Sequence, residues 1–427
     1  MGTGQVLYKQ ETEKICPECQ SKIPIHKGYV SWCECGYNIK INNSERPQTK
    51  LNRLYDQLGN KRGERIYRSL IAKKEFSPGM RFSKMPVFLL ATLVHFVSIS
   101  SLFLGIYLIA FHNSNYLLIA SGLGLLGISW LARPRAPKLE KTEHLIPRDQ
   151  YPNLYSAADQ LADAMKVRRI DGIVINEDFN ASVTQIGWRR RNIIKIGYPL
   201  FSLLEPEEQM AILAHEFGHI KNGDLTRSFY IGSALFTLQT WYELLEPVSL
   251  DERENMGIAE LPVYYLMVII AQIPYLLFFL LVHLLYDDSQ KGEYLADDRA
   301  AKTVGYQHLI TAMGKFEYAE TFYSKVRDVA ITRIEMNVFN ALEEQLLTMP
   351  LREKERLSRC AQLESSRLDA THPPTFYRVQ MLEQVRSIPP SPPVNKEIIK
   401  KIPSELESQQ KRIQDMLIEN YRYHLNC

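Results

Sequence analysis

Three long runs without a formal charge interrupt a chain in which polar and apolar residues are otherwise mixed. They cover residues 86–110, 116–132 and 262–286, and a short polar break at 112–115 separates the first two. A helix needs about 20 apolar residues to cross a hydrocarbon core. The pattern therefore predicts a transmembrane hairpin at 85–132 and a third spanning helix at 262–286, rather than buried core helices, which seldom need such long uncharged runs.

A fourth, weaker apolar stretch covers residues 228–245, where Gln239 and Glu243 interrupt it. It fits either a further membrane crossing or an amphipathic helix lying on the membrane or against the core. Basic residues flank the hairpin on both sides, which places both flanks in the cytoplasm by the positive-inside rule. We therefore expect a multi-pass protein of the cell membrane, with its N-terminus and soluble domain facing the cytoplasm.

The rest of the chain divides around these runs. We expect a cysteine-bearing module at 1–45, a charged linker at 46–84, a soluble domain at 139–385 interrupted by the later membrane helices, and a Pro-rich linker with an exposed charged helix at 386–427. Residues 172–176 (GIVIN) and 193–197 (IIKIG) are β-branched and flank a polar turn, which indicates a small hairpin or sheet. The expected fold class is mainly α with a small β-sheet.

Composition narrows the function classes only a little. The 427 residues are 45% hydrophobic and 23% charged, close to globular averages, which excludes general disorder. The formal net charge of +3 is too small to argue for a nucleic-acid partner, and none is expected.

The clearest chemical motif lies in a predicted helix that begins near Pro206 and ends at Asn222-Gly223. It contains the letters AHEFGHI. His215 and His219 are four residues apart, so both imidazoles project from one face and can hold a single zinc ion, with Glu216 beside them as the general base. This is the HExxH pattern of metallopeptidases.

Catalytic zinc usually has three protein ligands. The metzincin pattern would require a histidine at position 225, which is leucine, so that class is excluded. Glu293 and Asp297 share one face of the helix that continues from the third apolar run, within GEYLADDRA. We expect Glu293 to be the third ligand and Asp297 to accept a hydrogen bond from a ligand histidine.

These motifs and their order resemble a peptidase family that includes the HtpX-type membrane heat-shock proteases and the CAAX prenyl proteases. AHEFGHIKNGD, EYLADDRA and THPPTFYRVQML (371–382) carry the resemblance over roughly residues 85–385. It implies a mostly helical gluzincin domain on membrane helices. It also implies that His372 stabilises the intermediate and that Arg378 belongs to the same site.

The segment at 180–197 resembles the strand that lies beside the cleft in that family. By this resemblance Asn180, Ala181 and Ser182 bind substrate. An edge strand can pair with an extended peptide through main-chain hydrogen bonds, which predicts broad specificity.

Four of the six cysteines lie close together near the N-terminus. Cys16, Cys19, Cys33 and Cys35 supply two pairs of thiolates, which indicates a structural zinc site of the zinc-ribbon kind. Iron–sulfur ligation is a less favoured alternative. The chain is then expected to hold one catalytic and one structural zinc.

Taken together, these features predict an integral-membrane zinc endopeptidase that acts on unfolded or membrane-associated proteins, with peptide substrates and membrane lipid as its partners. Two alternatives remain open: a narrow CAAX-type processing protease, and a non-catalytic membrane adaptor that uses its zinc ribbon. The sequence does not determine the oligomeric state.

Overall fold

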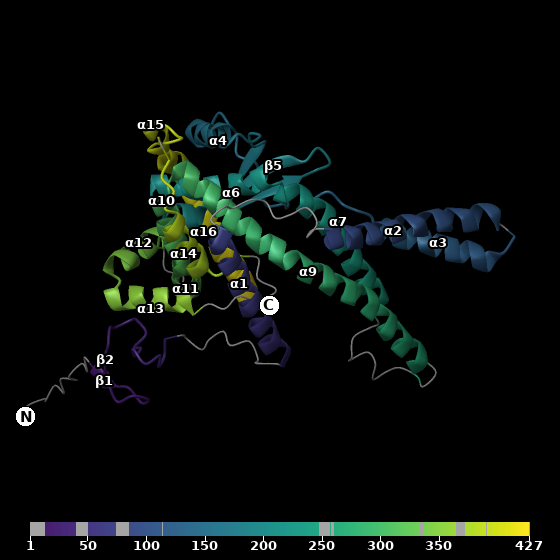
Figure 1. Ribbon diagram of the computed structural model, residues 1–427, viewed down its shortest axis with the longest axis horizontal. Helices are drawn as coiled ribbons and strands as arrows, with labels where there is room; N and C mark the ends of the chain where they lie inside the picture. Colours follow the sequence, from purple (N-terminus) through teal and green to yellow (C-terminus); the bar gives the residue numbers. More distant parts are fainter. Residues whose placement is uncertain are drawn as a thin grey trace, which may run out of the picture.

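The computed structural model describes residues 13–39, 50–73, 85–112, 114–246, 257, 260–332, 336–363, 372–389 and 391–426. The boundaries expected at 45 and 84 lie outside these residues. Figure 1 shows a helical body from which long helices extend. The expected mainly α fold with a small sheet is confirmed.

The N-terminal part is small and precedes the long helices. It contains the antiparallel strands β1 (Glu13–Ile15) and β2 (Lys22–Pro24), followed by the helix α1 (Lys50–Lys73). The next two helices, α2 (Met85–Phe111) and α3 (Tyr116–Leu131), form the expected helical hairpin. Ser101 and Ser129 are hydrogen-bonded across this hairpin, with 2.7 Å between their hydroxyl oxygens.

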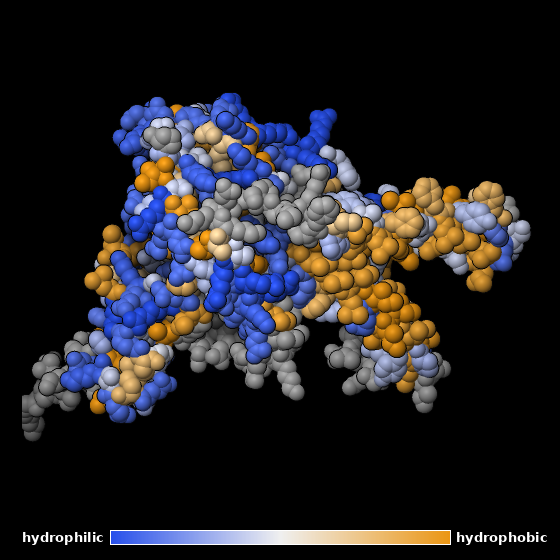
Figure 2. Space-filling model, viewed as in Figure 1, coloured by the Kyte–Doolittle hydropathy of each residue, from blue (hydrophilic) through white to orange (hydrophobic). Residues whose placement is uncertain are grey.

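Two helices, α2 and α9 (Leu261–Val304), are long and apolar enough to cross a membrane. The helix α3 is apolar but shorter, and α7 (Asp224–Leu245) is not among the candidate spans of the described residues. Many large apolar side chains of α2 and α9 are exposed, and Figure 2 shows apolar surface over the extended helices beside a mainly polar body. Multi-pass insertion and its orientation remain predictions.

A three-stranded sheet lies against the body. Its strands are β3 (Gly172–Asn176), β4 (Ala181–Ile186) and β5 (Arg191–Gly197), in the spatial order β3-β5-β4. The sheet was expected, but 172–176 and 193–197 do not form a hairpin. They pair in parallel, because β4 lies between them in the sequence and forms the antiparallel hairpin with β5.

The remaining helices form the body around α6 (Pro206–Asn222). They are α4 (Pro152–Met165), α5 (Tyr198–Phe201), α10 (Tyr306–Lys315), η3 (Phe316–Tyr318), α11 (Ala319–Thr332), α12 (Val338–Thr348), α13 (Leu351–Gln362), α14 (Thr375–Val385), α15 (Lys396–Ile399) and α16 (Ile402–Asn426).

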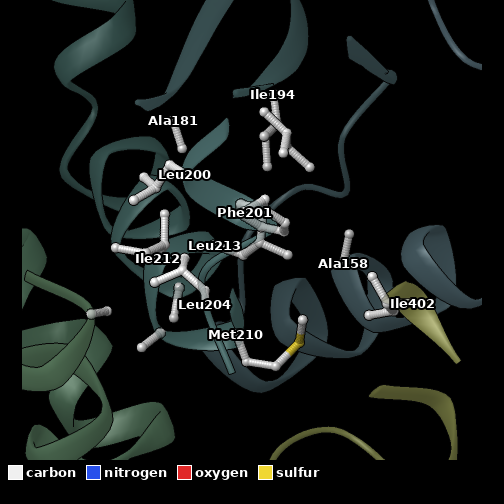
Figure 3. Close-up of a cluster of buried hydrophobic side chains, with 14 of the residues drawn as sticks. Ala158, Ala181, Ile194, Leu200, Phe201, Leu204, Met210, Ile212, Leu213 and Ile402 are labelled. Atoms are coloured by element: carbon white, nitrogen blue, oxygen red, sulfur yellow. The ribbon is translucent and has the colours of Figure 1, made fainter. Parts of the chain in front are cut away.

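One hydrophobic core joins the sheet to these helices. Phe201 and Leu213 are fully buried in it, next to Ile194 of the sheet and Ala158 of α4 (Figure 3). Burial of such side chains stabilises the body by about 1.5–3 kcal/mol each. The core holds α6 between the sheet and the other helices.

The C-terminal helix α16 differs from expectation. We expected an exposed charged helix, but Ile402, Leu406, Ile413 and Leu417 are buried in the main core. The Glu405 carboxylate also accepts hydrogen bonds from the backbone N–H groups of Asn153 and Leu154 at the start of α4, at 2.8 and 3.0 Å. The helix is charged overall, but its apolar residues form a stripe along one face. Because this stripe packs into the core, α16 is part of the body.

Candidate metal centre and active site

The helix α6 begins and ends at residues whose side chains suit those positions. Pro206 occupies its first turn, where a missing backbone N–H costs nothing, and Glu205 and Glu208 form a capping box. Gly223 ends it with φ of 72°, a left-handed conformation that glycine adopts without strain. The expected bounds of this helix are confirmed.

This helix directs both histidines toward α9. The Nε2 atoms of His215 and His219 are 3.1 Å apart, and each is 3.5 Å from a carboxylate oxygen of Glu293. One nitrogen from each imidazole and one oxygen of Glu293 lie within 4.8 Å of one another. Two imidazoles and a carboxylate are the donor set of many catalytic zinc sites, which leave a fourth position open. The residues present therefore fit a zinc ion.

Close packing of α6 on α9 makes this convergence possible. A Cβ atom placed on Gly218 would lie 2.8 Å from the Cα atom of Ala296, closer than real Cβ atoms approach. Glycine at 218, between the two histidines, thus lets the two backbones come together.

Each histidine is oriented by a second carboxylate through its other ring nitrogen. The Nδ1 atom of His215 is 2.8 Å from Asp297, and that of His219 is 2.9 Å from Asp224. Donation from Nδ1 leaves Nε2 free to act as a metal ligand. Asp297 was expected from the sequence, whereas Asp224 was not, although it is the last residue of the AHEFGHIKNGD motif.

Two residues of the segment around α14 complete the polar cluster. Arg378 donates two hydrogen bonds of 2.7 Å to the Asp297 carboxylate and lies 3.8 Å from Glu293. His372 is half exposed, and its Nδ1 atom is 2.8 Å from Glu293. The structure thus brings both of these residues to the metal centre, although they lie far along the chain from Glu293.

The buried carboxylates at the centre have different pKa values. Burial raises the pKa of Glu216, which favours its acceptance of a proton. Burial also opposes ionisation of Glu293, but its neighbours His215, His372 and Arg378 outweigh burial and hold the pKa of Glu293 well below its usual range. Glu293 is therefore an anionic donor, and Glu216 suits the role of general base.

A cleft of about 530 Å³ opens beside these residues. Its polar end contains Glu216, His219, Glu293 and His372, and one wall is the start of β4, including Asn180, Ala181 and Ser182. Other lining residues come from α7 and α9. The apolar ones are Leu225, Ile231, Leu235 and Leu285. Sequence reasoning missed this apolar wall because its residues belong to two helices that meet only in the fold.

Among the described strands β4 pairs only with β5, so it is an edge strand of this sheet. The N–H group of Gly197 donates to the Asn180 carbonyl at 2.8 Å. In an antiparallel pair, successive residues of a strand then direct their backbone N–H and C=O groups alternately toward the partner strand and away from it. Ser182 and Thr184 direct their backbone groups toward β5, whereas Ala181 and Val183 direct theirs outward. The outward groups are the ones available to an extended peptide.

The four cysteines of the N-terminal module also converge. The sulfur atoms of Cys16 and Cys35 are 3.6 Å apart, those of Cys19 and Cys33 are 3.4 Å apart, and all four lie within 4.8 Å of one another. Four thiolates in this arrangement fit a closed tetrahedral zinc site. This four-cysteine cluster confirms the expected zinc-ribbon-like extension.

The module packs on α13 of the body. Trp32 is fully buried, and its indole N–H donates to the Arg352 carbonyl at 3.3 Å. The guanidinium groups of Arg352 and Arg359 lie over its ring, at 4.4 and 4.8 Å from the ring centre.

Comparison with known proteins agrees with this geometry. The model of peptidase family M48 matches residues 151–386, more than half of the chain. The chain belongs to peptidase family M48. The matched residues include every member of the polar cluster described above and exclude the cysteine module.

Several similar proteins carry the name Protease HtpX. The protein from Pseudomonas savastanoi pv. phaseolicola is 27% identical over 141 residues, which are 32% of this chain and 46% of that protein. The one from Pseudomonas fluorescens is 28% identical over 216 residues, 47% of this chain and 70% of the relative. The chain thus spans about half the length of the first relative, and the resemblance to HtpX-type proteases read from the sequence is confirmed.

Proposed function

We propose that the chain is an integral-membrane, zinc-dependent endopeptidase that hydrolyses peptide bonds of unfolded or membrane-associated proteins. The observation that carries this proposal is the cleft in which Glu216, His219 and Glu293 lie beside the edge strand β4. His215 completes the ligand cluster with His219 and Glu293. Membership of family M48 supports the class of reaction.

The roles of the residues follow from their positions. Zinc, held by His215, His219 and Glu293, would supply Lewis-acid chemistry for the scissile carbonyl and the attacking water. Glu216, buried and with a raised pKa, takes a proton from that water and delivers it to the leaving amine. His372 is half exposed next to Glu293, from where a ring N–H donates to the developing oxyanion.

Two residues keep the others in place. Asp297 holds the His215 ring by accepting from Nδ1, and Arg378 holds Asp297 through two hydrogen bonds. A bidentate arginine–carboxylate pair is strong and directional, which fixes the ligand geometry.

The walls of the cleft indicate the substrate class. The outward groups of Ala181 and Val183 allow a peptide to add to β4 through its main chain, with little demand on its sequence. The apolar wall of α7 and α9 favours apolar side chains, which are exposed in unfolded and membrane-extracted proteins. A folded domain cannot present an extended strand there.

Insertion in the membrane is supported by the exposed apolar side chains of α2 and α9. With the basic flanks of the α2–α3 hairpin in the cytoplasm, the cleft also faces the cytoplasm. A narrow processing protease would share this chemistry and differ only in selectivity. A non-catalytic adaptor is disfavoured because ligands and general base are all present.

The test compares Glu216→Gln with wild type in reconstituted membranes. Loss of the general base should lower turnover of an unfolded reporter by about 10²–10⁴-fold while zinc content and peptide binding are kept. Glu207→Gln, on the same helix but away from the cleft, is the control and should keep activity. Unchanged turnover in Glu216→Gln would refute the proposed mechanism, and cleavage confined to one short sequence would favour the processing protease.

A further inference from the structure

The tip of the β4–β5 hairpin carries an unusual group of exposed side chains. Trp188 is 70% exposed, and Arg189, Arg190 and Arg191 follow it, all exposed. Among the described residues, no carboxylate lies within ion-pair distance of these three guanidinium groups. Three unpaired cations beside an exposed indole need an external partner or remain hydrated.

The tip lies where the apolar helices leave the body. Trp188 contacts Phe229 of α7, with their ring centres 6.0 Å apart, and the Arg190 guanidinium lies over the same phenyl ring at 5.4 Å. The Gly187 N–H donates to the Pro137 carbonyl at 2.9 Å, which ties the tip to the segment after α3. The hairpin tip is therefore held against the base of α3 and α7.

Other arginine–aromatic pairs occur at the end of α3 and in the segment that follows it. The Arg133 guanidinium lies 3.8 Å from the ring centre of Trp130 at the end of α3, and Arg135 lies 5.0 Å from that of Phe236 in α7. Tryptophan and arginine together are typical of the headgroup region of a bilayer, where the indole lies among acyl carbonyls and the guanidinium binds phosphate. Glu143, in the segment that follows, is paired with Lys195 and does not neutralise the tip.

From this arrangement we propose that residues 188–191 form a binding site for anionic phospholipid headgroups, which rests on the proposed membrane insertion. Phosphodiester oxygens accept from the three guanidinium groups, and Trp188 enters the headgroup region. Because the tip continues directly into β4, headgroup binding holds the substrate-pairing edge in place and orients the cleft along the membrane surface. Anionic lipid should therefore raise the efficiency of cleavage without taking part in the chemistry.

The experiment uses the full chain reconstituted in vesicles of phosphatidylcholine alone or with about 30% phosphatidylglycerol. The reporter is an unfolded peptide of zero net charge, so that the lipid does not attract it. In wild type, phosphatidylglycerol should raise kcat/KM about three- to tenfold, mainly through KM, and added salt should reduce the gain. R189Q/R190Q/R191Q should lose the gain but keep the basal activity in phosphatidylcholine and the zinc content.

Two further variants separate charge from folding. R189K/R190K/R191K keeps the charge and should keep most of the stimulation. K396Q/K400Q/K401Q removes three exposed charges at the distant α15 and should behave as wild type. In a second measurement, brominated lipid should quench the fluorescence of wild type more than that of Trp188→Phe, because Trp188 lies in the headgroup region.

The outcomes distinguish this site from the proposed function. Stimulation that survives in R189Q/R190Q/R191Q, or equal quenching in Trp188→Phe, would overturn the lipid site while the peptidase stands. Stronger stimulation by an oligonucleotide than by phosphatidylglycerol would also overturn it, in favour of a nucleic-acid patch. Absence of activity in every vesicle would count against the proposed function instead, and the quenching measurement would still test the lipid site.

Discussion

The two candidate ligand histidines are each oriented by a carboxylate from a different helix. His215 depends on Asp297 of α9, which Arg378 holds in turn, and His219 depends on Asp224 at the start of α7. Asp224 is itself held by the Asn222 side-chain amide, at 3.1 Å. Such partners fix the tautomer and direction of the ligand ring.

Asp224→Asn should therefore weaken zinc binding at the catalytic site about ten- to a hundredfold, with activity falling in step when zinc is limiting. The amide cannot accept in the same way as the carboxylate, so the His219 ring loses its fixed orientation. Competition with a chelator measures the change. Asp149→Asn, at an exposed position, is the control, and wild-type affinity in Asp224→Asn would exclude the proposed orientation of His219.

Among the elements, β4 connects the sheet to the cleft. Gly197 permits this connection, because a Cβ atom there would lie 1.8 Å from the Asp178 carbonyl oxygen, in the segment that leads into β4. The strand register decides which of its backbone groups remain for substrate. From the sequence alone, Ser182 and Thr184 would be natural positions for a test with proline, but both direct their N–H groups into the sheet.

Val183→Pro should raise KM for an unstructured peptide and leave kcat and zinc content largely intact, because it removes an outward N–H from the edge. Val183→Ala controls for the lost side chain and should have a smaller effect. Thr184→Pro should instead lower the thermal midpoint, since it removes a hydrogen bond to β5. Wild-type KM in Val183→Pro would show that substrate does not pair with β4.

For the whole molecule, two complete ligand sets occur far apart in the sequence, one in the cysteine module and one between α6 and α9. Metal analysis of the full chain should find about two equivalents of zinc. His215→Ala should remove one equivalent and Cys16→Ser the other. If Cys16→Ser lost both, the two sites would not be independent, and if Glu293→Gln kept full zinc and activity, the ligand assignment would be wrong.

The orientation of the molecule in the membrane gives a further prediction. The α2–α3 turn should lie outside the cell and the body inside, because basic residues flank the hairpin only at its other end. Ser114→Cys should react with an impermeant thiol reagent in intact cells, whereas Glu45→Cys and Gln150→Cys should react only after lysis. The unsubstituted chain gives the background labelling of the native cysteines. The reverse labelling pattern would contradict this orientation and place the cysteine module in an oxidising compartment.

The features that the sequence predicted correctly depend on local chemistry. The four-residue spacing of His215 and His219 places them on one helix face whatever surrounds them, and Pro206 and Gly223 define the ends of that helix. The uncharged runs likewise predicted α2, α3 and the apolar half of α9. Glu293 was predicted as a ligand because a zinc site needs a third one and an acidic pair at helical spacing followed one of these runs.

Features that depend on distant segments were decided by the tertiary structure. The charged composition of α16 indicated exposure, but a narrow apolar stripe was enough to bury it in the core. The parallel pairing of β3 with β5 and the apolar wall of the cleft also required contacts between elements. Such contacts form when surfaces that lie far apart in the chain pack together. The sequence by itself determined the features set by local spacing, such as two histidines on one helix face or a long apolar run.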